Sequence, residues 1–260
     1  MHKLQIINLI AANTDPDFSS GETNSSKGVP LAQDHSTDEK LTFVFKFLKK
    51  CLVLILDTKY LILIMIGIVN YGAGNIFSLT AALERQNITY GMVNTETDFD
   101  KYSHIIIPGV GHAGAAMKKL EQTGLVGAIK ALKKPVLGIC VGMQLITEHS
   151  EEGDAELLDI VPVKTKKFDK ALQIKIPHMG WNDVEHKNNS LFEGVEDNAQ
   201  FYFVHSYFIE YNPTFDIASA NYGLKFSAAV QKDNFYGVQF HPEKSGKAGE
   251  QILKNFSNLS

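Results

Sequence analysis

From Met65 onward, short apolar runs alternate with segments of helical periodicity, and this alternation restricts the fold more than any other feature of the chain. Each apolar run is long enough for one buried strand, and each periodic segment is long enough for one helix packed against it. Strands and helices that alternate in this way are typical of a mainly parallel sheet with helices on both faces. The sequence therefore predicts an α/β protein with a doubly wound mixed sheet.

The expected elements fall into two groups along the chain. Strands are expected first at residues 66–70, 104–108 and 135–139. Helices are expected at residues 76–86, 113–131 and 141–149. The later half is richer in aromatic and β-branched residues, which favours antiparallel or mixed strands, here at residues 201–208, 217–220, 226–231 and 235–239. The charged segment 164–170 is interpreted as a solvated turn between strands.

Residues 1–64 differ in character from the rest of the chain. Residues 14–40 contain almost no large apolar side chains, so they cannot offset the entropy that is lost on ordering. The stretch 41–69 is strongly apolar, but Asp57 and Lys59 would each cost about 2.5–3.5 kcal/mol inside a membrane. We therefore expect no membrane anchor. Residues 1–64 are predicted to be a poorly ordered extension, native or read from an upstream start codon, and residues 65–260 to be the functional domain.

Composition and cysteine usage exclude several classes of partner and cofactor. The formal net charge of -4 gives no electrostatic reason to expect nucleic acid as a partner. The 2 cysteines cannot build a disulfide framework, which favours a reducing compartment, the cytoplasm. No His or Cys residues have the spacing of metal ligands, so we expect neither a metal nor another cofactor.

Cys140 occupies the position of a nucleophile at a sharp turn between a strand and a helix. It follows the apolar run 135–139, and Gly138 and Gly142 flank it two residues away on each side. A nucleophile at such a turn has a strained backbone, and small neighbours are needed because the chain folds back closely on itself. A buried structural cysteine beside two unrelated glycines is equally compatible with this segment taken alone.

His241 and Glu243 supply the groups that a cysteine nucleophile needs. His241 follows the expected strand 235–239, and its imidazole can take the thiol proton and return it to a leaving amine. Glu243 can fix the tautomer of the imidazole and stabilise its charged form. A lone histidine after a strand is more often a loop or core residue. Together with Cys140, however, these residues predict a Cys-His-Glu triad.

The loop Pro108-Gly-Val-Gly111 follows another expected strand. Its backbone N–H groups could point toward a negative charge that develops on a substrate oxygen. The amides of Val110, Gly111 and Val141 are therefore the candidate oxyanion hole. An ordinary glycine-rich turn between a strand and a helix would explain the same pattern.

These three motifs together resemble the class I, triad-type glutamine amidotransferases, in which a Gly-x-Cys-x-Gly turn precedes a His-Pro-Glu motif by about a hundred residues, as here. The resemblance implies a flavodoxin-like architecture and a glutaminase activity. It implies that Cys140 attacks the carboxamide of glutamine, that His241 shuttles the proton and that Glu243 orients His241. The residues that it implies around the bound glutamine are Gly109, Gly142, Gln144, Ser206 and Tyr207.

Further motifs narrow the resemblance to the glutaminase subunits of imidazole glycerol phosphate synthases. They are Asn70-Tyr-Gly-Ala-Gly-Asn75, Pro108-Gly-Val-Gly111, Gly142-Met-Gln-Leu145, Ser150-Glu-Glu-Gly153, Pro177-His-Met-Gly-Trp-Asn182, Tyr202-Phe-Val-His-Ser-Tyr207 and Gln239-Phe-His-Pro-Glu-Lys-Ser245. The resemblance implies a heterodimer with a (β/α)8 cyclase, which receives the ammonia and forms imidazole glycerol phosphate in histidine biosynthesis. The residues that it implies at the subunit interface are Asn70, Asn75, Met179, Trp181 and Lys244.

The sequence also departs from the family pattern, and other functions stay open. His112 and Ala113 follow the glycine loop where the family usually has a small residue and a phenylalanine, which bears on the packing under that loop. The alternatives are another cysteine hydrolase, a glutaminase that serves a different synthase, and a binding scaffold without activity. The narrower motifs argue against the first two, and the intact triad argues against the third.

Overall fold

The computed structural model describes residues 65–260, and the predictions for residues 1–64 lie outside this range. No helix within residues 65–260 is long and apolar enough to cross a membrane. The centre of the domain is a set of parallel strands in the spatial order β2-β1-β3-β4-β13. Their bounds are β1 Met65–Val69, β2 Thr89–Val93, β3 His104–Ile107, β4 Val136–Ile139 and β13 Phe235–Val238.

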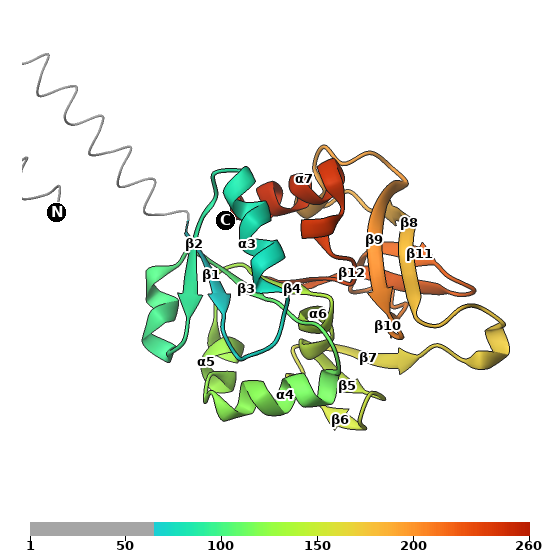
Figure 1. Cartoon of the computed structure of the whole chain (residues 1–260), viewed down its shortest axis with the longest axis horizontal. Helices are drawn as coiled ribbons and strands as arrows, with labels where there is room; N and C mark the ends of the chain where they lie inside the picture. Colours follow the sequence, from blue (N-terminus) through green and yellow to red (C-terminus); the bar gives the residue numbers. More distant parts are fainter. Residues whose placement is uncertain (1–64) are drawn as a thin grey trace, which may run out of the picture. The chain divides into compact units, whose positions relative to one another are not determined.

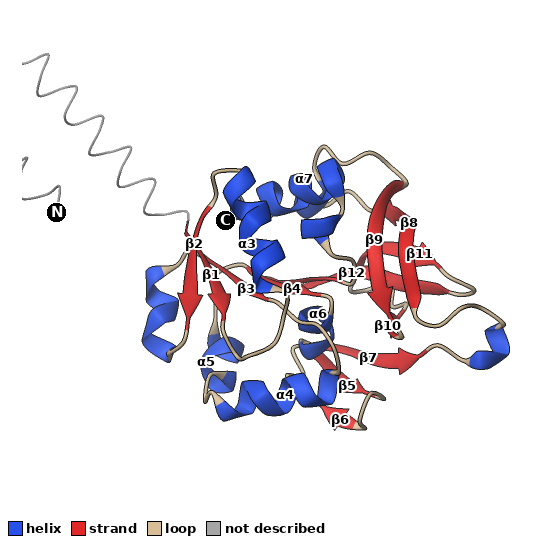
Figure 2. Cartoon of the chain, in the orientation of Figure 1, coloured by secondary structure: helices blue, strands red, loops and turns tan. Residues whose placement is uncertain are grey.

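Helices cover both faces of this parallel part of the sheet (Figures 1 and 2). On one face lie α3 (Ile76–Arg85) and α7 (Gly246–Ser257). On the other face lie α4 (Ala113–Gln122), α5 (Val126–Ala131) and α6 (Val141–Leu145). This arrangement confirms the predicted doubly wound α/β fold.

The parallel strands are buried because helices cover them from both sides, which explains why they are continuous apolar runs in the sequence. Every residue of β3 and of β4 is buried. On α3 the buried residues Leu79, Ala82 and Leu83 recur at helical spacing and face the sheet. Each large apolar side chain buried in this way contributes roughly 1.5–3 kcal/mol to folding.

Beyond β13 the sheet contains both antiparallel and parallel pairs, and its strands form the second half of the domain. It continues through β12 (Lys225–Lys232), β10 (Tyr207–Glu210), β7 (Val161–Lys167), β5 (Thr147–Ser150) and β6 (Ala155–Glu156). Off this path, β12 pairs with β11 (Asp216–Asn221), which pairs with β8 (His178–His186), which pairs with β9 (Ala199–His205). Short 3-10 helices complete the domain: η1 (Glu96–Lys101), η2 (Lys170–Leu172), η3 (Ser190–Phe192) and η4 (Pro242–Lys244).

The single helix predicted for residues 113–131 is wrong, because the chain forms two helices there, α4 and α5. The break lies at Thr123 and Gly124, and Gly124 has a φ of +73°, which favours glycine. The Thr123 hydroxyl donates to the Leu120 carbonyl at 2.6 Å and accepts from the Leu125 N–H at 3.2 Å. A threonine side chain that bonds to the backbone in this way ends a helix rather than continues it.

Three other predictions are also wrong in their boundaries. The helix expected at 141–149 ends at Leu145, because the Thr147 hydroxyl donates to the Gln144 carbonyl at 2.8 Å and the chain then enters β5. Residues 164–167, expected in a turn, belong to β7, in which buried and exposed residues alternate. The strand expected at 201–208 is two strands, β9 and β10, separated by Ser206.

Candidate active site

The carboxyl ends of β3, β4 and β13 lie next to one another at one edge of the sheet. β4 and β13 are in register, with Gly138 opposite Gly237, and the Cys140 N–H donates to the Val238 carbonyl at 2.8 Å. β3 pairs with the other side of β4. The segments that follow these strands are therefore brought together although they are far apart in the sequence, at the place where open α/β sheets bind ligands.

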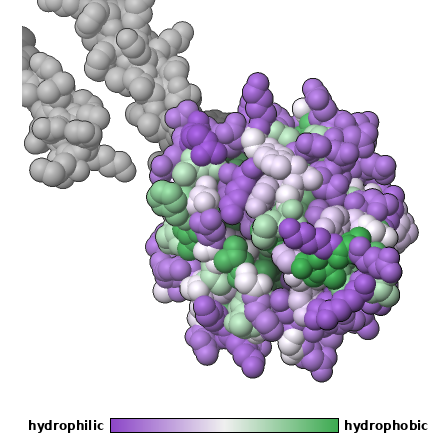
Figure 3. Space-filling view, turned by 45° about the vertical axis from the view of Figure 1, so that its right-hand side comes forward, coloured by the Kyte–Doolittle hydropathy of each residue, from purple (hydrophilic) through white to green (hydrophobic). Residues whose placement is uncertain are grey.

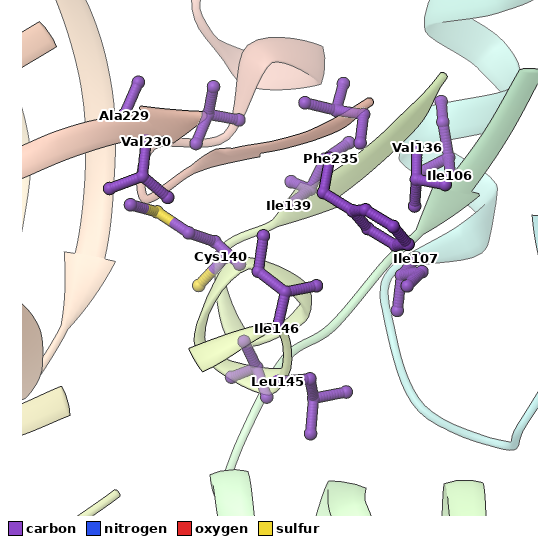
Figure 4. Close-up of a cluster of buried hydrophobic side chains, with 14 of the residues drawn as sticks. Ile106, Ile107, Val136, Ile139, Cys140, Leu145, Ile146, Ala229, Val230 and Phe235 are labelled. Carbon is purple, nitrogen blue, oxygen red and sulfur yellow. The ribbon is translucent and has the colours of Figure 1, made fainter. Parts of the chain in front are cut away.

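Cys140 has a backbone conformation that a residue with a side chain rarely adopts, with φ 55° and ψ -109°. Such a conformation costs on the order of 1–3 kcal/mol and persists only when its surroundings enforce it. A Cβ atom at Gly142 would collide with the carbonyl oxygen of Ile107, and one at Gly138 would collide with the backbone of Gly142. Both flanking glycines are thus required by close backbone contacts. Figure 4 shows Cys140 beside the buried side chains of β4 and α6.

His241 and Glu243 form a buried pair immediately after β13. The Nδ1 atom of His241 donates to Oε1 of Glu243 at 2.8 Å, and both side chains are almost completely buried. Burial opposes protonation of His241, but the neighbouring Cys140 and Glu243 outweigh it and raise the pKa of His241 to about 10. Within residues 65–260, Nε2 of His241 has no hydrogen-bond partner.

The thiol of Cys140 has polar contacts besides its interaction with His241. Its Sγ donates to the Val204 carbonyl at 3.9 Å and accepts from Nε2 of Gln239 at 3.7 Å. Cys140 and His241 line the same cavity, and Cys140 is one of the groups that raise the pKa of His241, so the two side chains are close enough to interact. The geometry is that of a cysteine beside a buried imidazole.

The cavity above Cys140 has a volume of about 310 Å³, which suits a ligand the size of one amino acid. It is lined by Val110, Gly111, Cys140, Val141, Gln144, Glu152, Pro177, Val204, His205, Ser206, Tyr207 and His241. Most of the residues predicted to form the site are in this group. Glu243, Gly109 and Gly142 do not line the cavity themselves, although Glu243 contacts His241, which does. The backbones of Gly109 and Gly142 are in contact, and a Cβ atom at Gly109 would collide with the N–H of Gly142.

The side chain of Tyr71 contacts the glycine loop that follows β3. Its phenol donates to the Pro108 carbonyl at 2.5 Å, and burial raises the pKa of Tyr71, so this hydrogen is retained. A Cβ atom at Gly74 would lie 2.9 Å from the Pro108 side chain, which shows how closely the loop after β1 packs here. The backbone position of Val110 and Gly111 therefore depends on the segment after β1.

Polar groups in the cavity wall include two that could bind a substrate. Nε2 of Gln144 donates to the Tyr207 carbonyl and to Oε1 of Gln239, both at 3.2 Å, while its own Oε1 is buried and unpartnered within residues 65–260. Oε2 of Glu152 accepts from the Ala113 N–H at 2.6 Å. Glu152 and Gln239 were missed as individual site residues, although both lie in motifs that the sequence singles out.

The residues predicted at a subunit interface fall on three segments, which are the loop after β1, strand β8 and the 3-10 helix η4. On β8, Met179 and Trp181 are 60% and 54% exposed. The Trp181 ring lies edge-on to Tyr202 at 6.1 Å, and Nζ of Lys244 lies 5.7 Å from the same tyrosine ring. Hydrophobic residues also interrupt the mostly hydrophilic surface in Figure 3. Phe77, which was not predicted, is 83% exposed.

Asn70 and Asn75 flank the loop after β1, and each already has a local hydrogen bond. Nδ2 of Asn70 donates to Oδ1 of Asn94 at 2.9 Å. Oδ1 of Asn75 accepts from the Ser78 N–H at 3.3 Å and caps the first turn of α3. The side chain of Asn75 thus has a structural role whatever else it contacts.

The comparison with protein families and curated proteins gives one consistent result. The family model for "Glutamine amidotransferase class-I" matches residues 67–259. The imidazole glycerol phosphate synthase subunit HisH of Bacteroides thetaiotaomicron is 45% identical over 197 residues, which are 75% of this chain and 99% of that protein. The HisH subunit of Salmonella typhimurium is 48% identical over 195 residues, which are 74% of this chain and 98% of that protein.

Solved structures share the fold at much lower sequence identity. PurLQS from Thermotoga maritima matches with a TM-score of 0.56 and 16% identity, over 75% of this chain and 97% of that chain. A crystal structure of a glutamine amidotransferase matches with a TM-score of 0.58 and 16% identity, over 74% and 96% of the two chains. The chain therefore belongs to the class I glutamine amidotransferase family and, within it, to the HisH family of imidazole glycerol phosphate synthase subunits.

Proposed function

We propose that this chain is a glutaminase that releases ammonia from glutamine at the Cys140 site. The observation that carries the proposal is the pairing of β4 with β13, which brings Cys140 and His241 to one cavity, with Glu243 hydrogen-bonded to the far side of the imidazole at 2.8 Å. A thiol, a base and a carboxylate in this order are the groups that acyl transfer through a thioester needs.

The reaction begins from an ion pair in which Nε2 of His241 already holds the proton of the Cys140 thiol, as the raised pKa of His241 favours, and Sγ of the thiolate attacks the carboxamide carbon of glutamine. The carbonyl oxygen becomes an oxyanion, and we assign its stabilisation to the amides of Val110, Gly111 and Val141, three residues that line the cavity. His241 then gives its proton to the amide nitrogen, the C–N bond breaks, and ammonia leaves behind a thioester on Cys140.

Water completes the cycle at the same atoms. His241 takes a proton from water, the hydroxide adds to the thioester carbon, and the C–S bond breaks to give glutamate. The ion pair of the thiolate and protonated His241 is thereby restored. Glu243 keeps Nδ1 of His241 protonated throughout, so that Nε2 is the nitrogen that accepts and donates.

Recognition of glutamine is assigned to Glu152, Gln144 and the segment that contains Ser206 and Tyr207. Glutamine has an α-ammonium group, and the carboxylate of Glu152 is the acidic group in the cavity wall. The buried, unpartnered Oε1 of Gln144 is a second acceptor for the same ammonium. We assign the α-carboxylate of glutamine to the Ser206 and Tyr207 side of the cavity.

The ammonia is proposed to pass to a (β/α)8 cyclase subunit, because the HisH relatives are named as subunits of imidazole glycerol phosphate synthase. The docking surface is assigned to Asn70, Asn75, Met179, Trp181 and Lys244, and to the exposed Phe77, which is two residues after Asn75. Large exposed apolar side chains of this kind usually mark an interface. Val204 lines the cavity and pairs with Met179 on β8, so the assigned surface adjoins the site.

The test is a comparison of glutamine-dependent and ammonia-dependent synthesis with the purified cyclase. Cys140→Ala should abolish glutamate formation and glutamine-dependent synthesis, whereas synthesis from added ammonium salts should continue because the chemistry of the partner is untouched. Glutaminase activity that survives in Cys140→Ala would contradict the assignment. Stimulation by a different synthase, and not by the cyclase, would reject the partner but not the glutaminase.

A further inference from the structure

Two buried histidines on neighbouring strands are joined directly to each other. Nδ1 of His178 on β8 lies 2.9 Å from Nε2 of His205 on β9, and the two residues are opposite each other in the strand register. Their exposed fractions are 3% and 6%. The rings that pack against the pair belong to Phe168, Phe203, Tyr222 and Phe226.

The hydrogen bonds of this pair determine which nitrogens carry hydrogen. Burial lowers the pKa of His178 to about 4 and that of His205 to about 3, so both rings are neutral near pH 7 and each carries one N–H. Nδ1 of His205 lies 2.8 Å from the Tyr207 carbonyl, which can only accept, so this nitrogen must be the donor. Nε2 of His205 is then an acceptor, and Nδ1 of His178 must donate to it.

The same reasoning extends the row of hydrogen bonds outward on β8. With its hydrogen on Nδ1, His178 has a free acceptor at Nε2, and Nδ2 of Asn182 lies 3.4 Å from it. That amide also donates to the Asn221 carbonyl at 3.0 Å. All four ring nitrogens thus have a partner, and every bond points from Asn182 toward Tyr207.

At its inner end the row reaches the catalytic cavity. The Tyr207 carbonyl that accepts from His205 also accepts from Gln144 at 3.2 Å. The Gln144 amide bonds in turn to Gln239, whose own amide contacts Sγ of Cys140 at 3.7 Å. A continuous polar network therefore connects strand β8 with the wall of the cavity and with the sulfur.

At its outer end the network lies on the strand that carries the exposed Met179 and Trp181. Side chains alternate along β8, so His178 faces inward while Met179 faces solvent. From these contacts we infer that His178 and His205 are positioning residues, which hold the Tyr207 carbonyl, and with it the wall of the glutamine cavity, at a fixed distance from the exposed strand β8. This inference rests on the proposed glutaminase function.

Two polar rings in an aromatic cluster need a reason, because apolar side chains would fill the same space without four ring nitrogens that each need a hydrogen-bond partner. A purely structural pair would contribute to folding stability alone. A positioning pair also controls how tightly the cavity binds glutamine, because Ser206 lies between His205 and the carbonyl that the pair holds. Disrupting the pair would lower stability in either case, but it would raise KM for glutamine only if the pair is a positioning pair.

The test compares His178→Leu with His178→Asn in the complex with the cyclase. The Asn side chain can place an N–H where Nδ1 of His178 is and still donate to His205, whereas Leu leaves Nε2 of His205 buried without a donor. His178→Leu should raise KM for glutamine on the order of tenfold, with kcat changed much less, and His178→Asn should recover most of the loss. Phe203→Leu, which perturbs the same cluster without touching a hydrogen bond, should lower stability and leave KM unchanged.

A measurement on the unaltered chain keeps the inference testable even if His178→Leu does not fold. Nitrogen-15 NMR of the imidazoles should show both rings neutral at pH 6, with hydrogen on Nδ1. Hydrogen on Nε2 of either ring, a charged ring, or a KM that Leu and Asn change equally or not at all would overturn it. Failure of the proposed function is distinct, because the unaltered complex would then not hydrolyse glutamine at all.

Discussion

The main-chain N–H of Cys140 donates a 2.8 Å hydrogen bond to the carbonyl of Val238, three residues before His241. This bond fixes the strained turn at Cys140 to β13, the strand that His241 follows. The relative position of the proposed nucleophile and the proposed base therefore depends on the register of β4 and β13 rather than on their separation in the sequence.

Gly142→Ala should destabilise the chain by roughly 1–3 kcal/mol, because the new Cβ atom would collide with the Ile107 carbonyl, which cannot move without displacing β3. Gly127→Ala is the matched control. Nothing lies within 4 Å of a Cβ atom at Gly127, and it is a helical position of α5, where alanine is favoured by about 0.5–1 kcal/mol. Urea unfolding of both variants gives the two free energies, and equal values would contradict the clash.

Glu243→Gln should lower both the activity and the pKa of His241. The carboxylate is one of the groups that raise the pKa of His241 to about 10, and an amide cannot stabilise the imidazolium in the same way. By analogy with other triads we expect kcat to fall roughly 10²- to 10⁴-fold. The kcat for glutamine and an NMR titration of His241 check the two effects, and an unchanged titration would mean that Glu243 does not act on the imidazole.

The stability of the unaltered chain should depend on pH through the same pair. The pKa of His241 is higher in the folded than in the unfolded state, so protonated His241 stabilises the fold fully below about pH 6.5. This contribution is lost as the pH rises through the folded pKa of about 10. Urea unfolding between pH 6 and pH 10 should therefore show a smaller decline for Glu243→Gln than for the unaltered chain, and identical slopes would exclude the linkage.

Glu152→Gln should weaken binding of glutamine with little effect on the chemical step. The amide keeps an acceptor for the Ala113 N–H but removes the charge that we assign to the α-ammonium group, and a hydrogen bond to a charged group contributes about 1.5–3 kcal/mol. The expected result is a rise in KM of roughly 10- to 100-fold. Glu151→Gln is the control, because Glu151 bonds to the Lys167 N–H outside the cavity. Equal KM values for the two variants would remove Glu152 from the site.

Trp181→Ala should weaken binding of the cyclase roughly 10- to 100-fold, because an exposed tryptophan is a common centre of binding energy at an interface. Its side chain is 54% exposed in the isolated chain, so the thermal midpoint should change little. Tyr211→Ala removes another surface aromatic side chain, one that lies under Lys225 instead, and serves as the control. Calorimetric titration measures both affinities. An unchanged affinity for Trp181→Ala would move the interface elsewhere.

The sequence predicts the catalytic edge of the sheet well because its signals are local. Buried parallel strands need continuous apolar runs, so residues 105–107 and 136–139 are recognisable without the structure. The glycines around Cys140 are similarly informative, because close backbone contacts allow no side chain there. The three motifs follow β3, β4 and β13, and these strands are neighbours in the sheet in the same order as in the sequence.

The sequence predicts the walls of the cavity less well because long-range contacts decide them. The chain leaves α6 early so that Thr147 and its neighbours can pair with β7, a strand whose charged residues suggested a turn. Glu152 reaches the cavity only as a result of that pairing. The contact between His178 and His205 depends likewise on the register of β8 and β9, which no periodicity in either segment specifies.

The rigid mounting of Cys140 has a consequence for how such a molecule could diversify. The backbone of the turn is clamped by the Ile107 carbonyl on one side and by the Val238 carbonyl on the other. The residues to which we assign recognition of the substrate, Glu152 and residues 204–207, belong to other segments of the cavity wall. Substitutions that alter substrate preference can therefore accumulate in the cavity wall without displacing the sulfur of Cys140.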